Sequence, residues 1–484
     1  MGLVAKQTFY NLLSIGLAFI LGALNTLYMY PNFLGSRLQG VIIALLAYSN
    51  LVQPFISFGL QHAIIKYYSS LKTKEEKDSL LIFAIWSPLI IIVLILIYLW
   101  MFSSSIIDDI SSKEPLISTY AFVIILIAIS TSYFEIFFSW LRVHLASVFG
   151  NFLKEFYPRL LNFILLLCYA IKLIDFDIFV YCLITGYYIR LLLVILYSFK
   201  IYTPKFTFTL PPFYLKIILY SFLIFLSGAA SSIILDIDKS MIASLITSND
   251  VAFYSVALFI AAVIEAPGRA MFQIVSPLVS KAINSNDKIY LKRLLKKSSN
   301  NLFLVSGALF ILINLNLDDF YVFVDQPMYA VGIGVVSIVS VGKLYSMSIG
   351  CLNNIISNSK FYPYIFWFSV LSASIAVVLN FILIPEYGIM GAAYATLFVI
   401  FFINTLKLFL VGYKLKIHPY SIESLKTSIV IILVYLAISQ INLEYTSFIN
   451  LTLRSVFIIL LYVILSQIAG LLKDFNIQIQ KFLN

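Results

Sequence analysis

About fourteen mostly apolar stretches follow one another along this chain, and each is long enough to cross the roughly 30 Å hydrocarbon core of a bilayer as a helix. They run over residues 8–30, 40–65, 79–101, 116–141, 150–173, 177–199, 214–237, 250–277, 300–317, 328–357, 361–385, 388–412, 425–441 and 447–471. The connections between them are short, and none has the length of a soluble domain. We therefore predict an all-α polytopic membrane protein with about fourteen transmembrane helices.

The composition agrees with this class. Hydrophobic residues make up 62% of the chain and charged residues 11%, against about 45–50% and 25% in ordinary soluble domains. A net charge of +10 would suit a nucleic-acid-binding protein, but the basic residues are spread over short loops instead of being gathered in a polar domain. No nucleic-acid partner is expected.

Lysine and arginine are distributed unequally between the two sets of loops. With a cytoplasmic N-terminus, the outer loops contain only Arg37, Lys113, Lys172 and Lys239, while most of the 32 basic residues lie at or near the inner side. Such an excess marks the cytoplasmic face of a membrane protein. Both termini are therefore predicted to be cytoplasmic.

A weak internal repeat suggests how the helices are grouped. Pro31–Ser69 and Asp236–Ala282 both have a short polar tip, a long apolar run, a proline within that run and a basic end. Repeats of this kind occur in transporters. We predict a six-helix lobe at residues 1–213, a second at 214–423, and an extra helix pair with a cytoplasmic tail at 424–484.

No group of residues has the pattern of a catalytic or metal site. The three cysteines and three histidines are scattered without metal-ligand spacing, and there is no glycine-rich phosphate loop. No outer loop is large enough to hold an active site. We expect no enzyme activity, no cofactor and no metal.

Ionisable residues inside the predicted spans are the candidate binding residues. Each would cost about 2.5–3.5 kcal/mol at the bilayer centre, so it is expected to face protein or a water-filled cavity. Glu265 and Arg269 are four residues apart, and they can pair on one helix face. The alternative is a purely structural ion pair. The other candidates are Lys343 in the tenth span, Glu135 and Arg142 in the fourth, and Asp236, Asp238 and Lys239 at the end of the seventh. Arg142 has the further alternative of extending to the membrane surface.

The longest predicted inner loop, residues 284–300, alternates apolar and basic residues. This pattern predicts a short basic amphipathic helix lying on the anionic inner leaflet. A solvated linker with the same charges is the alternative interpretation.

Three blocks of the sequence resemble a known family. Pro31–Tyr68, Asn249–Lys281 and Ile384–Phe402 are similar to conserved blocks of polysaccharide-biosynthesis membrane proteins, the O-antigen and capsule repeat-unit flippases. These belong to the multidrug/oligosaccharidyl-lipid/polysaccharide exporter superfamily. The resemblance implies two six-helix lobes around a central cavity, in a bacterial cytoplasmic membrane.

The implied activity is the transfer of oligosaccharide repeat units on undecaprenyl pyrophosphate from the inner to the outer leaflet by alternating access. The implied partners are the lipid-linked oligosaccharide, membrane lipid, a glycan polymerase and glycosyltransferases. Relatives have charged cavity residues at places that match Arg269 and the neighbours Asp238 and Lys239. Arg269 and Lys343 would then meet the pyrophosphate, and Glu135 and Glu265 would aid its release.

Two other functions are compatible with parts of the sequence. A cation-coupled drug or metabolite antiporter of the same superfamily would use membrane carboxylates that titrate, for which Glu135, Glu265, Asp236 and Asp238 qualify. A membrane glycan polymerase or ligase is the more distant alternative, because it would need a large outer loop.

Overall fold

The computed structural model describes residues 3–111, 114–144, 146–205, 209–441 and 445–472. Over these ranges the regular structure is helical and contains no strand, as predicted. The chain forms two compact units, Met1–Ala252 and Phe253–Asn484. The predicted tail, residues 473–484, lies outside the described residues.

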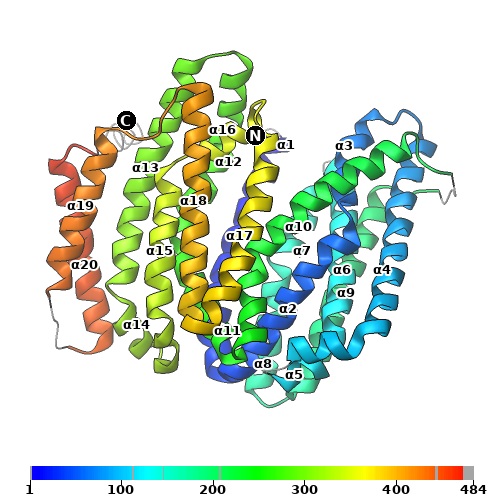
Figure 1. Ribbon diagram of the computed structural model, residues 1–484, viewed down its shortest axis with the longest axis horizontal. Coiled ribbons are helices and arrows are strands. Elements are labelled where there is room, and N and C mark those ends of the chain that lie inside the picture. The colour runs from blue at the N-terminus through cyan, green and yellow to red at the C-terminus, as the bar shows by residue number, and fades with distance from the viewer. Residues whose placement is uncertain (1–2, 112–113, 145, 206–208, 442–444, 473–484) are drawn as a thin grey trace. The chain divides into compact units, whose positions relative to one another are not determined.

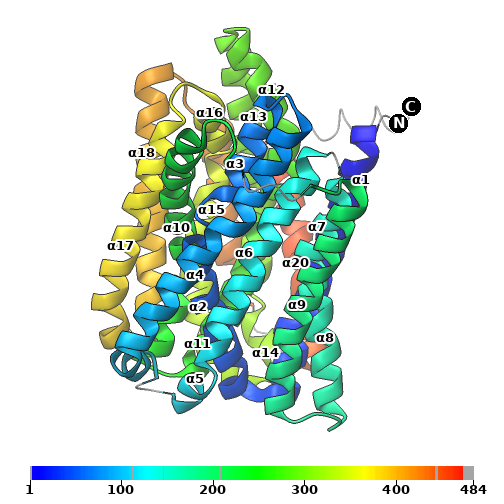
Figure 2. The same ribbon diagram turned by 90° about the vertical axis from the view of Figure 1, so that its right-hand side faces the viewer.

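The first unit is built around α2. Its helices are α1 (Leu3–Leu24), η1 (Asn25–Leu34), α2 (Gly35–Ser57), α3 (Leu60–Tyr67), η2 (Tyr68–Ser70), α4 (Lys74–Ser111), α5 (Pro115–Thr119), α6 (Ala121–Val143), α7 (Ser147–Glu155), α8 (Tyr157–Ala170), α9 (Phe176–Ile201) and α10 (Tyr214–Leu245). α2 packs against both α6 and α10, and α6 packs against α9, beside which it lies in Figure 2. α11 (Ser248–Ala262) begins in this unit and ends in the next.

A sharp turn between α2 and α3 requires glycine. Phe58 and Gly59 both have left-handed backbone conformations, with φ of 46° and 73°. A Cβ atom on Gly59 would lie 2.4 Å from the backbone oxygen of Ser221 in α10. Glycine therefore allows both the turn and the close packing of α10.

The second unit continues with η3 (Val263–Glu265), α12 (Ala266–Asn284), α13 (Lys288–Asn314), α14 (Leu317–Phe323), η4 (Pro327–Gly332), α15 (Ile333–Ser348), α16 (Leu352–Asn358), α17 (Pro363–Tyr387), α18 (Ile389–Leu415), α19 (Ile422–Ser439) and α20 (Ser447–Ile468). α15 packs between α13 and α18, and α19 and α20 cover another side of α13 (Figure 1). The extra helix pair is thus attached to α13, and its second helix, α20, also packs against α14.

Apolar packing holds this pair in place. Ile311 of α13, Val434 of α19 and Ile458 of α20 are fully buried in one cluster. The Tyr462 hydroxyl donates a hydrogen bond to the carbonyl oxygen of Leu304, at 2.7 Å. The outer faces of the pair are apolar and exposed, as expected of helices in contact with lipid.

Ten helical segments among the described residues are long and apolar enough to cross a membrane, or up to twelve if two bent pairs each form one span. The predicted number of fourteen is not confirmed. The first two predicted spans are joined by the π-helix η1 into one helical stretch, Ser14–Ser57. The predicted span 150–173 is divided at Phe156 into α7 and α8, and each is too short to cross alone.

The predicted surface helix in residues 284–300 is wrong. A turn ends α12, with Asn286 in a left-handed conformation and Asp287 capping the next helix through the Tyr290 N–H, at 2.8 Å. The basic residues that follow form the first turns of the 27-residue helix α13. They continue into a membrane-length helix because no proline or glycine interrupts residues 288–306.

The unit boundary differs from the predicted lobe boundary. α10 opens the predicted second lobe, yet it packs against α2 and α3 in the first unit. The division into lobes at residues 213 and 423 stays a prediction.

Candidate functional site

The helix that contains Glu265 and Arg269 is irregular. α11 ends at Ala262, a 3₁₀ turn covers Val263–Glu265, and α12 begins at Ala266 with Pro267 in its first turn. Because proline has no N–H group, the α-helical hydrogen bonds cannot continue through this position. Beside this break, the carbonyl oxygen of Ile264 accepts a hydrogen bond from the Ser306 hydroxyl of α13, at 2.8 Å.

Glu265 pairs with Lys343 of α15. The distance from Lys343 Nζ to Glu265 Oε2 is 3.0 Å, and the two side chains are 23% and 24% exposed. The predicted Glu265–Arg269 pair is therefore wrong. The 3₁₀ turn ends at Glu265, so the two residues do not share the face that a continuous α-helix would give them.

Arg269 is exposed, and no ion pair or hydrogen bond joins it to any residue that the structure describes. It lies at the end of the membrane-length segment Ser248–Arg269. An arginine cannot lose its charge in this setting. It is thus a cation in a spanning segment with all its donors available to a ligand.

In the first unit, Glu135 of α6 pairs with Lys154 of α7, at 2.7 Å, and these side chains are 20% and 40% exposed. Arg142 lies two turns further along α6. Its side chain is exposed, and its guanidinium lies 5.8 Å from the centre of the Phe138 ring. This position agrees with the alternative in which Arg142 extends to the membrane surface.

Asp236 and Lys239 form a second charged group in this unit. Lys239 Nζ lies 2.8 Å from Asp236 Oδ1, and the Asn50 side chain of α2 donates to Asp236 Oδ2 at 3.1 Å. One turn on, the Tyr48 hydroxyl donates to the carbonyl oxygen of Ser240, at 2.8 Å. Asp238 is buried, with 7% of its surface exposed. Most of the predicted site residues are therefore paired, and those of the first unit form two separate ion pairs, Glu135–Lys154 and Asp236–Lys239.

Sequence reasoning missed Arg190 in α9. It is only 5% exposed and donates a hydrogen bond to the Thr131 hydroxyl, at 3.2 Å. Its guanidinium also lies 4.4 Å from the centre of the Phe134 ring and 4.7 Å from that of Tyr187. The sequence signal that could have identified it is a cation in the middle of a predicted span. Among the described residues no carboxylate lies at ion-pair distance from Arg190, and its contacts with Thr131, Phe134 and Tyr187 indicate a structural role.

No group of three or more metal-binding side chains occurs in the part of the chain that the structure describes. The candidate chemistry is the recognition of a charged ligand by residues within membrane helices.

Solved structures of transporters share this fold. A lipid II flippase, MurJ, in an inward closed conformation, is 17% identical with a TM-score of 0.72, over 97% of this chain and 99% of that one. A multidrug resistance MATE family transporter of the MOP superfamily, in an inward-facing conformation, is 15% identical with a TM-score of 0.64, over 85% and 94%. A third, the MATE transporter VcmN of Vibrio cholerae, is 12% identical with a TM-score of 0.52, over 86% and 96%.

The long apolar helices define the class as a multi-pass membrane protein, whose fold resembles those of solved flippase and transporter structures. The family model of polysaccharide biosynthesis proteins matches residues 4–282, so the chain belongs to that family. The predicted family is therefore confirmed, and the match includes the first two sequence blocks, Pro31–Tyr68 and Asn249–Lys281, but not the third, Ile384–Phe402. None of the curated proteins matches the sequence.

Proposed function

We propose that this protein is a flippase that moves oligosaccharide repeat units on undecaprenyl pyrophosphate from the inner to the outer leaflet of a bacterial cytoplasmic membrane by alternating access. The observation that carries the proposal is Arg269, an exposed and unpaired cation in a spanning segment, one turn from the Glu265–Lys343 pair. The family match and the likeness to a lipid II flippase support it.

A pyrophosphate needs such a group because its charge cannot cross hydrocarbon unaided, whereas its polyprenyl chain can stay in the lipid. The planar guanidinium of Arg269 can bind two phosphate oxygens at once. Lys343 would be a second cation for the ligand, released when the pyrophosphate competes with Glu265. The Glu265–Lys343 ion pair would re-form when the ligand leaves, which keeps ligand binding reversible.

The test is the replacement of Arg269 by alanine. We expect a normal amount of folded protein, because no described partner is left unpaired, and an accumulation of lipid-linked saccharide in the inner leaflet. Arg269→Lys should restore transport only in part, since a point charge replaces a two-pronged donor. Accessibility of the saccharide to a lectin on intact cells and on inverted vesicles measures its leaflet.

The matched control is Lys281→Ala. This variant removes one exposed positive charge from the same helix, α12, outside the membrane-length segment. It should transport normally. Normal surface glycan in cells with a fully expressed Arg269→Ala variant would contradict the proposal.

A cation-coupled drug antiporter is the second candidate, favoured by two carboxylates, the half-buried Glu265 and the buried Asp236. It predicts that Glu265→Gln abolishes drug resistance conferred by the overexpressed protein. The flippase proposal predicts no resistance in cells with either form of the protein.

A further inference from the structure

The N-terminal half of α13 lines a basic pocket that the proposed transport reaction does not use. The pocket has a volume of about 780 Å³, and it is closed by the start of α19 and by Gly470 and Leu471 after α20. Four cations and one carboxylate line it, namely Lys292, Arg293, Lys296, Lys297 and Glu423. The charge of the lining is thus strongly positive.

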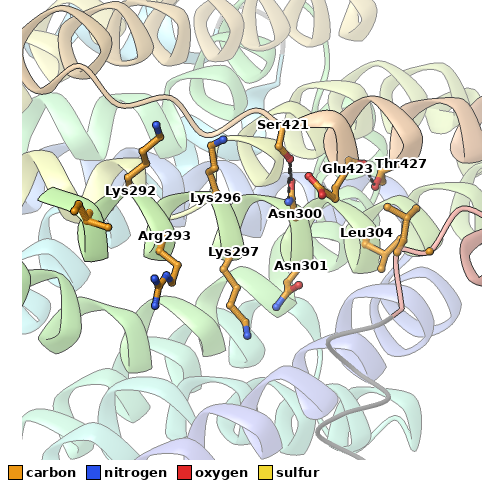
Figure 3. Close-up of a pocket in the computed structure, with 13 residues that line it drawn as sticks. Lys292, Arg293, Lys296, Lys297, Asn300, Asn301, Leu304, Ser421, Glu423 and Thr427 are labelled. Carbon is orange, nitrogen blue, oxygen red and sulfur yellow. Dashed lines mark hydrogen bonds between the residues drawn. The ribbon is translucent and has the colours of Figure 1, made fainter.

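The cations form two rows on one helix. Lys292 and Lys296 are four residues apart, as are Arg293 and Lys297, and the rows lie about 100° apart around α13. Figure 3 shows Lys292 and Lys296 extending from one side of α13 and Arg293 and Lys297 from another. Like charges at this spacing repel one another. No ion pair joins Lys292, Arg293 or Lys296 to a carboxylate in the described part of the chain, so a bound anion would relieve the repulsion.

The walls of the pocket are fixed by hydrogen bonds. Asn300, one turn beyond Lys296, exchanges hydrogen bonds with the Ser421 hydroxyl at 3.1 Å, and its Oδ1 accepts from the Ser424 hydroxyl at 2.8 Å. These bonds hold the N-terminus of α19 beside α13. Lys426 Nζ donates to the carbonyl oxygen of Ala469 at 3.0 Å, which ties α19 to the end of α20. The pocket is therefore a built concavity and not a stretch of solvated lysines.

The pocket lies at the end of membrane-length helices. Its lining includes the apolar side chains of Ile289, Leu304 and Leu471. Further along α19, Leu425, Ile432 and Leu436 are more than half exposed, on a surface suited to acyl chains. A ligand that presents phosphate to the cations and hydrocarbon to these helices fits both features.

We infer that this pocket binds the phosphate of an anionic phospholipid headgroup, which links α13 to the extra helix pair. Basic pockets between membrane helices recognise such headgroups through charge-assisted hydrogen bonds. The inference is independent of the transported substrate, and it holds whether the protein moves a lipid-linked saccharide or another molecule.

The experiment titrates the purified full-length protein, in uncharged detergent at low ionic strength, with a fluorescent phosphatidylglycerol. Lys292→Gln/Lys296→Gln should weaken binding by about 25-fold, since each Lys or Arg near a membrane surface contributes about fivefold. Lys292→Arg/Lys296→Arg should bind within about twofold of the wild type, because charge is retained. Phosphatidylcholine should not saturate the site.

The control is Lys281→Gln/Lys288→Gln. It removes two exposed lysines near the same end of the unit, and neither lines the pocket. This variant should keep most of the affinity for phosphatidylglycerol. Equal weakening in both glutamine variants would overturn the inference, because it would show attraction by overall charge.

Two further outcomes test whether the bound phosphate belongs to a lipid and whether the lysines have a structural role. Inorganic pyrophosphate that binds as tightly as phosphatidylglycerol would overturn the lipid assignment in favour of a soluble phosphate ligand. Without lipid, Lys292→Gln/Lys296→Gln should be at least as stable to heat as the wild type, because repulsion is reduced. A lower melting temperature would instead assign these lysines a structural role and contradict the inference.

Discussion

Two ion pairs of the second unit each include a cation of a membrane-length segment, Lys343 in Pro327–Ser348 and Arg454 in Ser447–Ile468, and their surroundings differ. Arg454 of α20 pairs with Asp319 of α14 at 2.6 Å, and both side chains are 16% exposed. Arg454 also donates to the carbonyl oxygen of Leu315 at 2.9 Å, while Asn450 donates to the other oxygen of Asp319 at 3.1 Å. This pair is enclosed in a network of hydrogen bonds.

The Lys343–Glu265 pair is joined by a single contact of 3.0 Å among the described residues, is about a quarter exposed, and lies near the unpaired Arg269. A charged group kept for structure has its hydrogen-bonding capacity filled by the protein. A charged group kept for a ligand must retain free capacity. By this criterion, the enclosed Arg454–Asp319 pair is structural, whereas the Lys343–Glu265 pair and Arg269 form the candidate ligand site.

The largest expected effect follows from breaking the enclosed pair. Arg454→Ala should lower the free energy of unfolding by about 3–5 kcal/mol, because the mostly buried carboxylate of Asp319 loses its counter-charge. Arg454→Ala/Asp319→Asn should recover part of this loss. Heating in detergent with a fluorescence readout measures both. An unchanged melting temperature in Arg454→Ala would show that the Arg454–Asp319 pair is not structural, and would contradict the distinction drawn between the two pairs.

Breaking the half-buried Lys343–Glu265 pair should affect stability less, and transport more, than Arg454→Ala does. Lys343→Met is expected to cost about 1 kcal/mol of stability, since Glu265 can be reached by water, yet to reduce saccharide transport strongly. The same assays, applied to the variant at matched protein amounts, measure both quantities. A loss of stability equal to that of Arg454→Ala would identify Lys343–Glu265 as another structural clamp.

The smallest effect concerns the pair between the exposed Arg37 and Glu114, a buried carboxyl that precedes α5. Arg37 donates hydrogen bonds of 3.0 and 2.8 Å to Glu114, which hold the pKa of that carboxyl below its ordinary value. Because the pKa is lower in the folded state, the pair stabilises the protein above the unfolded pKa of about 4.3 and loses this contribution as pH falls through the folded value. Melting temperatures should therefore decline below this pH.

Arg37→Met should make that decline shallower at acid pH. The change should be modest, since the Arg37 side chain is 59% exposed and solvent screens the pair. An identical pH profile in Arg37→Met and wild-type protein would show that other carboxyl groups control acid stability.

The helical class and the approximate positions of the spans could be predicted from the sequence, because twenty apolar residues in a row have few alternatives. The number of spans could not be predicted, since it depends on whether a turn such as η1 interrupts a helix or only bends it. The surface helix was mistaken for the same reason. A local amphipathic pattern does not reveal that the helix continues into the membrane as α13.

Individual site residues were easier to predict than their partners. Glu265, Arg269 and Lys343 were found because charge is costly within a span. Their pairing depends on the 3₁₀ turn before Pro267 and on the placement of α15, which no sequence spacing encodes. The partner of Glu135 is Lys154 on another helix, and only the packing of α6 and α7 brings them together.

The contact between Asn300 and the start of α19 has a consequence for biosynthesis. Ser421 follows Asn300 by 121 residues, so the ribosome completes α13 long before its partner is made. Chains emerge N-terminal end first, and during this interval the amide of Asn300 and the apolar face that later contacts Val434 and Ile458 have no protein partner. Insertion of α19 and α20 thus supplies the last packing partners of α13. A nascent chain halted before residue 421 would remain an intermediate in which this face of α13 has no protein partner.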